Sequence, residues 1–174
     1  MARLPYTAHV ATTVCSAVLV CGLAGAAWAD AGDNHVSADL AENIGVLSAT
    51  HTMLTAGYAR RIAGDRGYVE ARLGAGTTGS LLVLEGRGGI GLVFAPSPRV
   101  DLLVGWRLGD SYFRGSIGDA PYAVHMLAIE VVVQLAIALD RDWRLRAVPL
   151  APTLFWNRTY GGALGVELGI DHAF

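Results

Sequence analysis

The sequence has few cysteines and no lysine. Its two cysteines, Cys15 and Cys21, both lie in the N-terminal segment before Asp30. The chain that follows this segment has no thiol, which excludes disulfides, cysteine nucleophiles and thiolate metal sites there. All thirteen basic residues are arginine, against fifteen acidic residues. This slightly acidic balance gives no indication of a nucleic-acid partner.

Long apolar runs are absent after residue 29. No run reaches the roughly 18 residues that a membrane-spanning helix needs. The most apolar segment, HMLAIEVVVQLAIAL at 125–139, is interrupted by Glu130 and Gln134. Paired metal-ligand spacing is also missing, because the histidines at 35, 51, 125 and 172 are isolated and no calcium or zinc loop occurs. We therefore expect no helical membrane span, no metal and no cofactor.

The first 29 residues have the layout of a secretory signal peptide. Arg3 lies near the start, an apolar stretch covers about residues 10–26, and the small-x-small site Ala27-Trp28-Ala29 precedes Asp30. We predict cleavage after Ala29, with Ala27 and Ala29 as the small residues of the cleavage site. The alternative is an uncleaved membrane anchor. Residues 30–174 are then expected to form one domain.

Apolar and polar residues alternate with a period of two through most of residues 30–174. This is the pattern of β-strands with two different faces. Short turn-like stretches occur at 63–67, 95–99 and 139–142, and longer or more variable connections at 47–51, 76–80, 109–121 and 157–162. These connections separate eight expected strands, near 35–46, 52–62, 68–76, 81–94, 100–108, 122–138, 143–156 and 162–174.

An even number of strands, with short turns at one end and longer loops at the other, is the plan of outer-membrane barrels. The sequence therefore predicts an all-β fold, an eight-stranded antiparallel up-and-down transmembrane β-barrel. The seventh strand contains Pro149 and Pro152, and a closed barrel has no free edge for proline, so we expect a bulge or break there.

The C-terminal stretch GALGVELGIDHAF alternates strictly and ends on an aromatic residue. One parity is Val166, Leu168, Ile170, His172 and Phe174. An apolar alternation that closes on phenylalanine resembles the assembly signal of bacterial outer-membrane barrels. With its length and turn layout, the chain from 30 to 174 resembles the small eight-stranded family that includes the OmpA barrel domain and OmpX. The resemblance implies a bacterial outer-membrane location and contact of these C-terminal residues with the outer-membrane insertion machinery.

Aromatic residues near the expected strand ends fit the same interpretation. Two belts are expected, with Phe94, Trp143 and Phe174 on the turn side and Trp106, Phe155, Trp156 and Tyr160 on the loop side. Ordinary core aromatics of a soluble β-sandwich are the alternative.

The polar parity of the strands carries many charges. If the apolar parity faces lipid, the barrel interior is predicted to hold a charge network of Arg60, Glu70, Arg72, Glu85, Arg87, Asp101, Arg107, Glu130, Arg144, Arg146, Glu167 and Asp171. Buried charges are tolerated when they are paired, and an eight-stranded barrel is just wide enough for side chains to fill. The prediction is a narrow lumen plugged by charge, and the alternative is a narrow channel through the network.

The expected function is a structural or surface-interaction role rather than catalysis. The longest expected loop, with Tyr112, Phe113 and Arg114, is the candidate for contact with lipopolysaccharide. A lipid-modifying enzyme of the lipid A deacylase type is the alternative, since His51, His125, Ser111 and Ser116 lie near loops, but no local spacing ties them together. We name no catalytic residue, and we expect a monomer with outer-membrane lipid as its surroundings.

Overall fold

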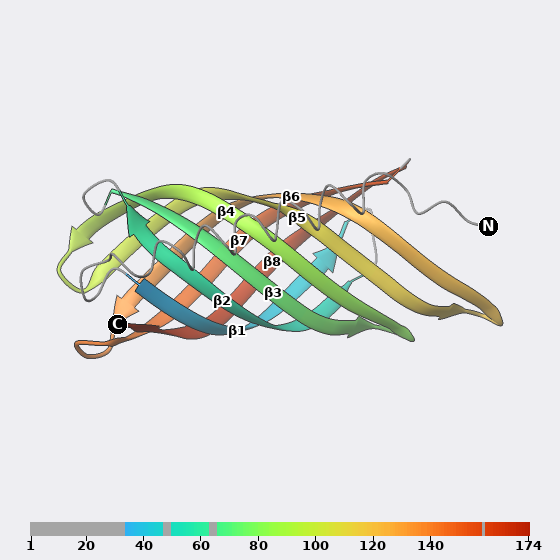
Figure 1. Cartoon of the computed structure of the whole chain (residues 1–174), viewed down its shortest axis with the longest axis horizontal. Helices are drawn as coiled ribbons and strands as arrows, with labels where there is room; N and C mark the ends of the chain where they lie inside the picture. Colours follow the sequence, from blue (N-terminus) through green and yellow to red (C-terminus); the bar gives the residue numbers. More distant parts are fainter. Residues whose placement is uncertain (1–33, 47–49, 63–65, 158) are drawn as a thin grey trace.

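The period-two segments of the sequence form eight antiparallel strands in the computed structural model, which describes residues 34–46, 50–62, 66–157 and 159–174 (Figure 1). The strands are β1 (Asn34–Gly45), β2 (His51–Ile62), β3 (Gly67–Thr78), β4 (Leu81–Ser97), β5 (Val100–Ile117), β6 (Ala120–Ala138), β7 (Trp143–Asn157) and β8 (Thr159–Ala173). Within these ranges, no helix is long and apolar enough to cross a membrane. The segment with the expected cleavage site at Ala27 and Ala29 lies outside the described residues.

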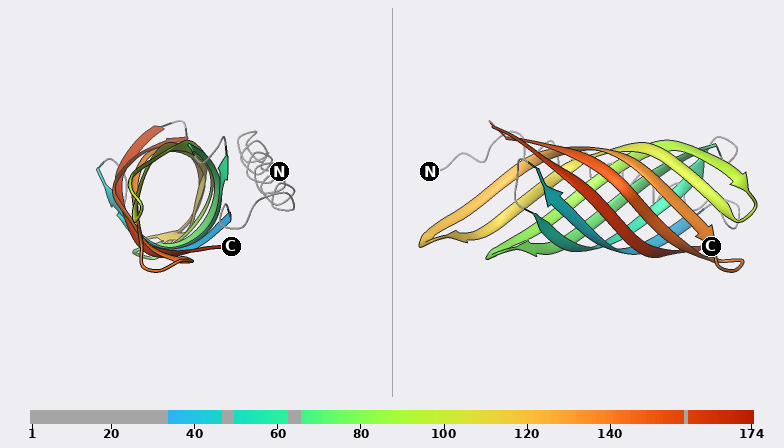
Figure 2. Two further views of the ribbon diagram at one scale, coloured as in Figure 1. Left: turned by 90° about the vertical axis from the view of Figure 1, so that its left-hand side faces the viewer. Right: turned by 180° about the vertical axis from the view of Figure 1, so that it is seen from behind.

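Each strand pairs with its neighbours in the chain, and β1 also pairs with β8, which closes the barrel (Figure 2). The closing register places Val36 opposite His172 and Leu40 opposite Leu168. Beyond the last pair, the N–H of Phe174 donates to the carbonyl oxygen of Asn34 over 2.9 Å. The predicted eight-stranded antiparallel meander is therefore confirmed, with every strand edge of the central wall paired.

The two ends of the barrel differ. We call the end with the connections β1–β2, β3–β4, β5–β6 and β7–β8 the hairpin end, and the opposite end the turn end. The turn end holds the connections between β2 and β3, β4 and β5, and β6 and β7, together with the C-terminus (Figure 1). Its turns after Ser97 and Ala138 confirm the short connections expected at 95–99 and 139–142, and part of the turn at 63–67 lies outside the described residues.

The hairpin end corrects the sequence prediction. The long loop expected at 109–121 is wrong, because β5 and β6 continue through it and turn only at Gly118 and Asp119. The described residues of the loop expected at 157–162 are also strand. Gly79 and Gly118 have φ angles of 56° and 60°, which glycine adopts without a steric cost, so the strands can reverse within two residues. Extended hairpins replace loops at this end.

A bulge in β7 changes which residues face inward. The pairing with β8 shifts between Val148 and Ala151, at Pro149, as the sequence predicts for this strand. The extra residue reverses the alternation, so that Phe155 points inward and Trp156 outward. The expectation that Phe155 belongs to a lipid-facing belt is therefore wrong, since its side chain is 0% exposed.

Candidate functional site

The middle of the barrel interior is filled by charged side chains. They come from seven of the eight strands and are all buried, so each lies where a charge must be compensated by a partner. The arginines are Arg72, Arg87, Arg107 and Arg146, and the carboxylates are those of Asp39, Glu70, Glu85, Glu130 and Glu167. We call these nine residues the central network.

Arg107 lies at the centre of this network and is 1% exposed. Its Nε donates to Glu70 over 2.7 Å, and its Nη1 donates to Glu130 over 3.0 Å and to Glu167 over 2.9 Å. One planar guanidinium thus joins β3, β6 and β8 to β5 through three carboxylates, a geometry that a lysine ammonium reproduces poorly.

The other three arginines extend the network around the barrel. Arg72 donates to Glu167 over 2.5 Å and to Asp39 over 2.8 Å. Arg87 lies 2.5 Å from Glu85 and 2.7 Å from Glu130. Arg146 makes longer contacts, 3.3 Å to Asp39, 3.6 Å to Glu167 and 3.8 Å to Glu70, so it is held less tightly than the others.

A second charged cluster lies closer to the turn end. Arg61 and Arg144 both donate to the same oxygen, Oδ2, of Asp101. The sequence prediction assigned Arg60 to this interior, and that assignment is wrong. Arg60 pairs with Val69, and directly paired residues point to the same face of a sheet. The residues on either side of Val69 are buried inside the barrel, so Val69 and Arg60 point outward and Arg61 points inward.

Asp171, another predicted interior residue, lies inside the barrel at the level of Arg144. Its nearest basic neighbour is His35, with 3.6 Å between His35 Nδ1 and Asp171 Oδ1. It also faces Arg144 across the β7–β8 pair. Asp171 is therefore separate from the central network, although both were predicted as one set.

Apolar side chains seal the hairpin end of the interior. Phe113 and Phe155 meet with ring centroids 6.4 Å apart, and His51 lies 5.7 Å from the Phe113 ring in an edge-on arrangement. Met53 and Val83 pack in the same cluster as Phe113. This apolar cap separates the central network from the hairpins, and sequence reasoning missed it because it placed Phe113 in a loop and Phe155 on the lipid face.

A histidine, a serine and a glutamate do converge beneath the cap. His51 Nε2 lies 3.3 Å from Glu85 Oε1, and Ser111 Oγ donates to the same oxygen over 2.9 Å. A nucleophile relay needs the histidine between the serine and the carboxylate, whereas here the glutamate is in the middle. All three side chains are buried, so the arrangement supports packing of the interior rather than acyl transfer.

Glycines create the room that the large interior residues occupy. A Cβ atom on Gly91 would lie 2.5 Å from the Tyr68 ring, and one on Gly105 would lie 2.5 Å from the Tyr68 hydroxyl. The two glycines therefore make space for a tyrosine, while a Cβ atom on Gly89 would meet the Glu70 carboxylate.

The outer wall is apolar over most of its surface. Leu54 is 71% exposed and Trp106 is 70% exposed. Exposed aromatic side chains occur near both ends, but Trp106 was misplaced by the sequence prediction, because β5 runs on from it to Ile117 and it lies in the wall. The other predicted belt and C-terminal residues that are exposed on this face are Phe94, Trp143, Trp156, Tyr160, Val166, Leu168, Ile170 and Phe174. His172 also belongs to this face and packs its ring 4.7 Å from that of Trp143.

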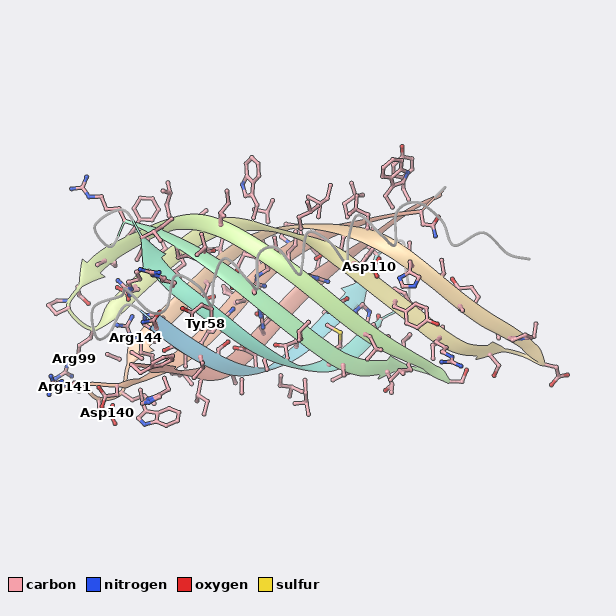
Figure 3. The ribbon with its side chains drawn as sticks, in the orientation of Figure 1. Tyr58, Arg99, Asp110, Asp140, Arg141 and Arg144 are labelled. Carbon is pink, nitrogen blue, oxygen red and sulfur yellow. The ribbon has the colours of Figure 1, made fainter. Side chains whose placement is uncertain are left out.

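One polar cluster interrupts the outer wall toward the hairpin end. His125 Nδ1 lies 2.7 Å from Asp110 Oδ2, and the Tyr112 ring stacks on the His125 ring with centroids 4.4 Å apart. Asp110 is labelled in Figure 3. Asn157 donates from its side chain to the His125 carbonyl oxygen over 2.6 Å. The histidine and the aspartate are partly exposed, so this cluster is accessible from outside the barrel.

Two small spaces adjoin the central network. A cavity of about 20 Å³ adjoins Arg72, Arg87 and Arg107, and one of about 30 Å³ adjoins Tyr68 and Arg146 nearer the turn end. Each has room for one or two water molecules. Across 34–46, 50–62, 66–157 and 159–174, no group of three histidine, cysteine or acidic side chains could hold a metal ion.

Comparisons with known proteins agree on the fold. No protein-family model matches the sequence, and no curated protein matches it either. Neisserial surface protein A has a TM-score of 0.70 at 14% identity, with 84% of this chain and 100% of that chain covered. Ail, the attachment invasion locus protein of Yersinia pestis, has a TM-score of 0.61 at 11% identity, with 83% and 100% covered. The outer membrane enzyme PagL has a TM-score of 0.50 at 10% identity, with 79% and 99% covered.

These similarities concern architecture, since the identities are low. They span almost the full length of each known structure, and they match the strand count, the meander order and the closed wall described above. The chain therefore has the fold of the small eight-stranded outer-membrane β-barrels.

Proposed function

We propose that the protein is an integral protein of the bacterial outer membrane whose barrel is closed to solutes and whose surface carries its function. The apolar outer wall supports the membrane location, because soluble proteins rarely expose an apolar surface of this extent. Outer-membrane barrels place their short turns in the periplasm, so the turn end is assigned to the periplasm and the hairpin end to the cell exterior.

The filled interior is the observation that carries the closed-barrel proposal. A solute crossing the barrel would have to displace Arg107 from three carboxylates and also part the rings of Phe113 and Phe155. Breaking a buried, paired charge costs several kcal/mol, about 3–5 by analogy with other proteins. A barrel of eight strands has no further width in which to bypass these groups.

Planar-bilayer recording tests this closed state. The mature protein, folded in detergent and shown by its mobility shift on boiling to be folded, is expected to give no stepwise conductance. A folded double variant, Arg107→Ala with Phe155→Ala, removes the centre of the network and part of the cap and serves as the comparison. Reproducible conductance steps from the unaltered protein would refute the closed barrel and favour the channel.

The external surface of the β5–β6 hairpin is the proposed contact with lipopolysaccharide. Tyr112 and Arg114 point outward there beside His125, whereas Phe113, which the sequence grouped with them, is buried in the cap. A cation and aromatic rings near the outer leaflet suit the phosphates and sugars of lipopolysaccharide. Arg114→Gln is expected to weaken lipopolysaccharide binding to the reconstituted protein, and Arg141→Gln, an exposed arginine at the other end, is the control. Equal binding by both variants would contradict this contact.

The C-terminal residues are proposed to be read by the outer-membrane insertion machinery. Val166, Leu168, Ile170 and Phe174 are exposed in a row along the outer face of β8. Removing Phe174 is expected to reduce the amount of folded protein in outer membranes, while Phe94→Ala, a change of an exposed aromatic on another strand, is the control. Because the wall closes within one chain, we propose a monomer, which light scattering in detergent would test.

A lipid-modifying activity is the second candidate, and one observation favours it. The His125 and Asp110 pair has the spacing of an oriented base and lies on the outer wall, and the similarity to PagL extends to the fold. A comparison of lipid profiles between a deletion strain and its complemented parent tests this candidate, with His125→Gln as the matched variant. Identical lipid profiles would exclude it.

A further inference from the structure

A polar pocket of about 220 Å³ opens at the turn end of the barrel. Three arginines, Arg61, Arg99 and Arg144, line it, and Asp101 is the one carboxylate among its described lining residues. Figure 3 shows Arg99 and Arg144 at this end of the molecule. The described lining of the pocket contains none of the residues of the central network. Its ability to bind a ligand does not depend on the proposed membrane function.

The charges in this pocket are not balanced. Arg61 and Arg144 both donate to the one oxygen Oδ2 of Asp101, so one carboxylate holds two guanidinium groups close together. Asp171 faces Arg144 across the β7–β8 pair but is not among the described residues that line this pocket. Each guanidinium has five N–H donors, and each directs one nitrogen to Asp101. The remaining donors have no other side-chain partner among the described residues, and Arg99 adds a third positive charge at the pocket rim.

The shape of the pocket is set by small and rigid residues. Ala136 and Ala138 are the lining residues from β6, and their short side chains leave the volume unfilled. Pro98 restricts the turn that carries Arg99. The N–H of Ala138 donates to the carbonyl oxygen of Arg99 over 2.8 Å, which ties this turn to β6. The side chains of Arg61 and Arg144 and the backbone of Arg99 are therefore held around a preformed space.

We propose that this pocket binds an oxyanion, a phosphate or sulfate group, between Arg61, Arg99 and Arg144. Guanidinium groups bind such anions through paired N–H donors, and an anion here offsets the positive charge that Asp101 leaves uncompensated. A volume of about 220 Å³ admits a phosphate group together with part of the molecule that carries it. The group could belong to a soluble periplasmic molecule or to a lipid headgroup, since both present the same oxyanion.

Titration with inorganic phosphate tests the site. The full mature chain is folded in a non-ionic detergent without phosphate, and the guanidinium N–H signals are followed by NMR at constant ionic strength. Saturable one-to-one binding is expected. Arg99→Gln, an exposed position, should weaken it about tenfold, the loss of a charge-assisted hydrogen bond. Arg141→Gln, an arginine of the next turn outside the pocket, should change it less than about twofold.

Ala138→Leu separates a built pocket from general attraction by positive charge. This variant keeps every arginine and narrows the space between them, so it should weaken phosphate binding. Added phosphatidylglycerol that competes with phosphate would assign the site to a lipid headgroup, and its failure to compete would assign the site to a soluble ligand. The proposal is overturned if neither anion saturates, if Arg141→Gln matches Arg99→Gln, or if Ala138→Leu binds normally.

Discussion

The substitution Arg107→Met tests whether the central network holds the barrel together. The arginine makes hydrogen bonds to three buried carboxylates. Its removal would affect these carboxylates unequally, because they differ in the other arginines that remain near them. Glu130 keeps Arg87 at 2.7 Å and Glu167 keeps Arg72 at 2.5 Å, whereas Glu70 is left with Arg146 at 3.8 Å. The cost should therefore be that of one uncompensated buried charge, about 3–5 kcal/mol of unfolding free energy, rather than three.

Urea unfolding in lipid vesicles, followed by tryptophan fluorescence, measures this cost. Adding Glu70→Gln to Arg107→Met should recover more than half of the lost stability, because it neutralises the carboxylate that the first change orphans. Arg114→Met, at an exposed position, is the control and should change stability by less than about 0.5 kcal/mol. A loss below about 1 kcal/mol for Arg107→Met, or a double variant no more stable than the single one, would refute this reasoning.

Three further predictions concern single positions. Gly105→Ala should lower the free energy of unfolding by about 1–3 kcal/mol, because its Cβ atom would lie 2.4 Å from a backbone oxygen, while Gly162→Ala, whose nearest contact is 3.8 Å, should be near neutral in the same urea assay. Phe155→Ala should cost about 3–5 kcal/mol there, with a smaller loss for Phe155→Leu; an equal loss for both would argue against the cap. The backbone N–H groups of Trp143 and Asp142 donate to the Asp140 carboxylate and hold its pKa below the usual range. The turn should therefore keep these two hydrogen bonds as pH falls through the ordinary aspartate range and lose them at lower pH. An NMR titration of the Asp140 carboxyl measures this.

Strand number and the faces of most strands follow from alternation alone. Arg72, Arg87 and Arg107 lie inside because their neighbours in sequence are small or apolar and must face outward together. The register of β2 was harder, because Arg60 and Arg61 are adjacent and periodicity gives either one the inner place. The pairing partner Val69 decides between them, and pairing is a tertiary property.

The hairpin end could not be read from composition in the same way. Glycine, serine and aspartate in 109–121 are typical of loops, yet two of these glycines lie within extended strands and only Gly118 makes the turn. The cap could not be predicted for a related reason. Phe113 falls in the expected loop, and alternation assigns an inner or outer face only to strand residues. The arginine pocket depends on three segments far apart in sequence, which no local spacing connects.

The bulge at Pro149 has a consequence for how β7 can vary. Before the extra residue, the even-numbered residues of β7 face the interior, and after it the odd-numbered residues do. Deleting one of the two residues between Val148 and Ala151 would remove the bulge and restore a regular alternation. Thr153 and Phe155 would still face inward and Trp156 outward, because the two parts of the strand would keep their present pairing with β8. Substitutions in this segment are constrained by the side they face, but the bulge is a place in β7 where the chain can lose one residue without reversing the side chains that follow.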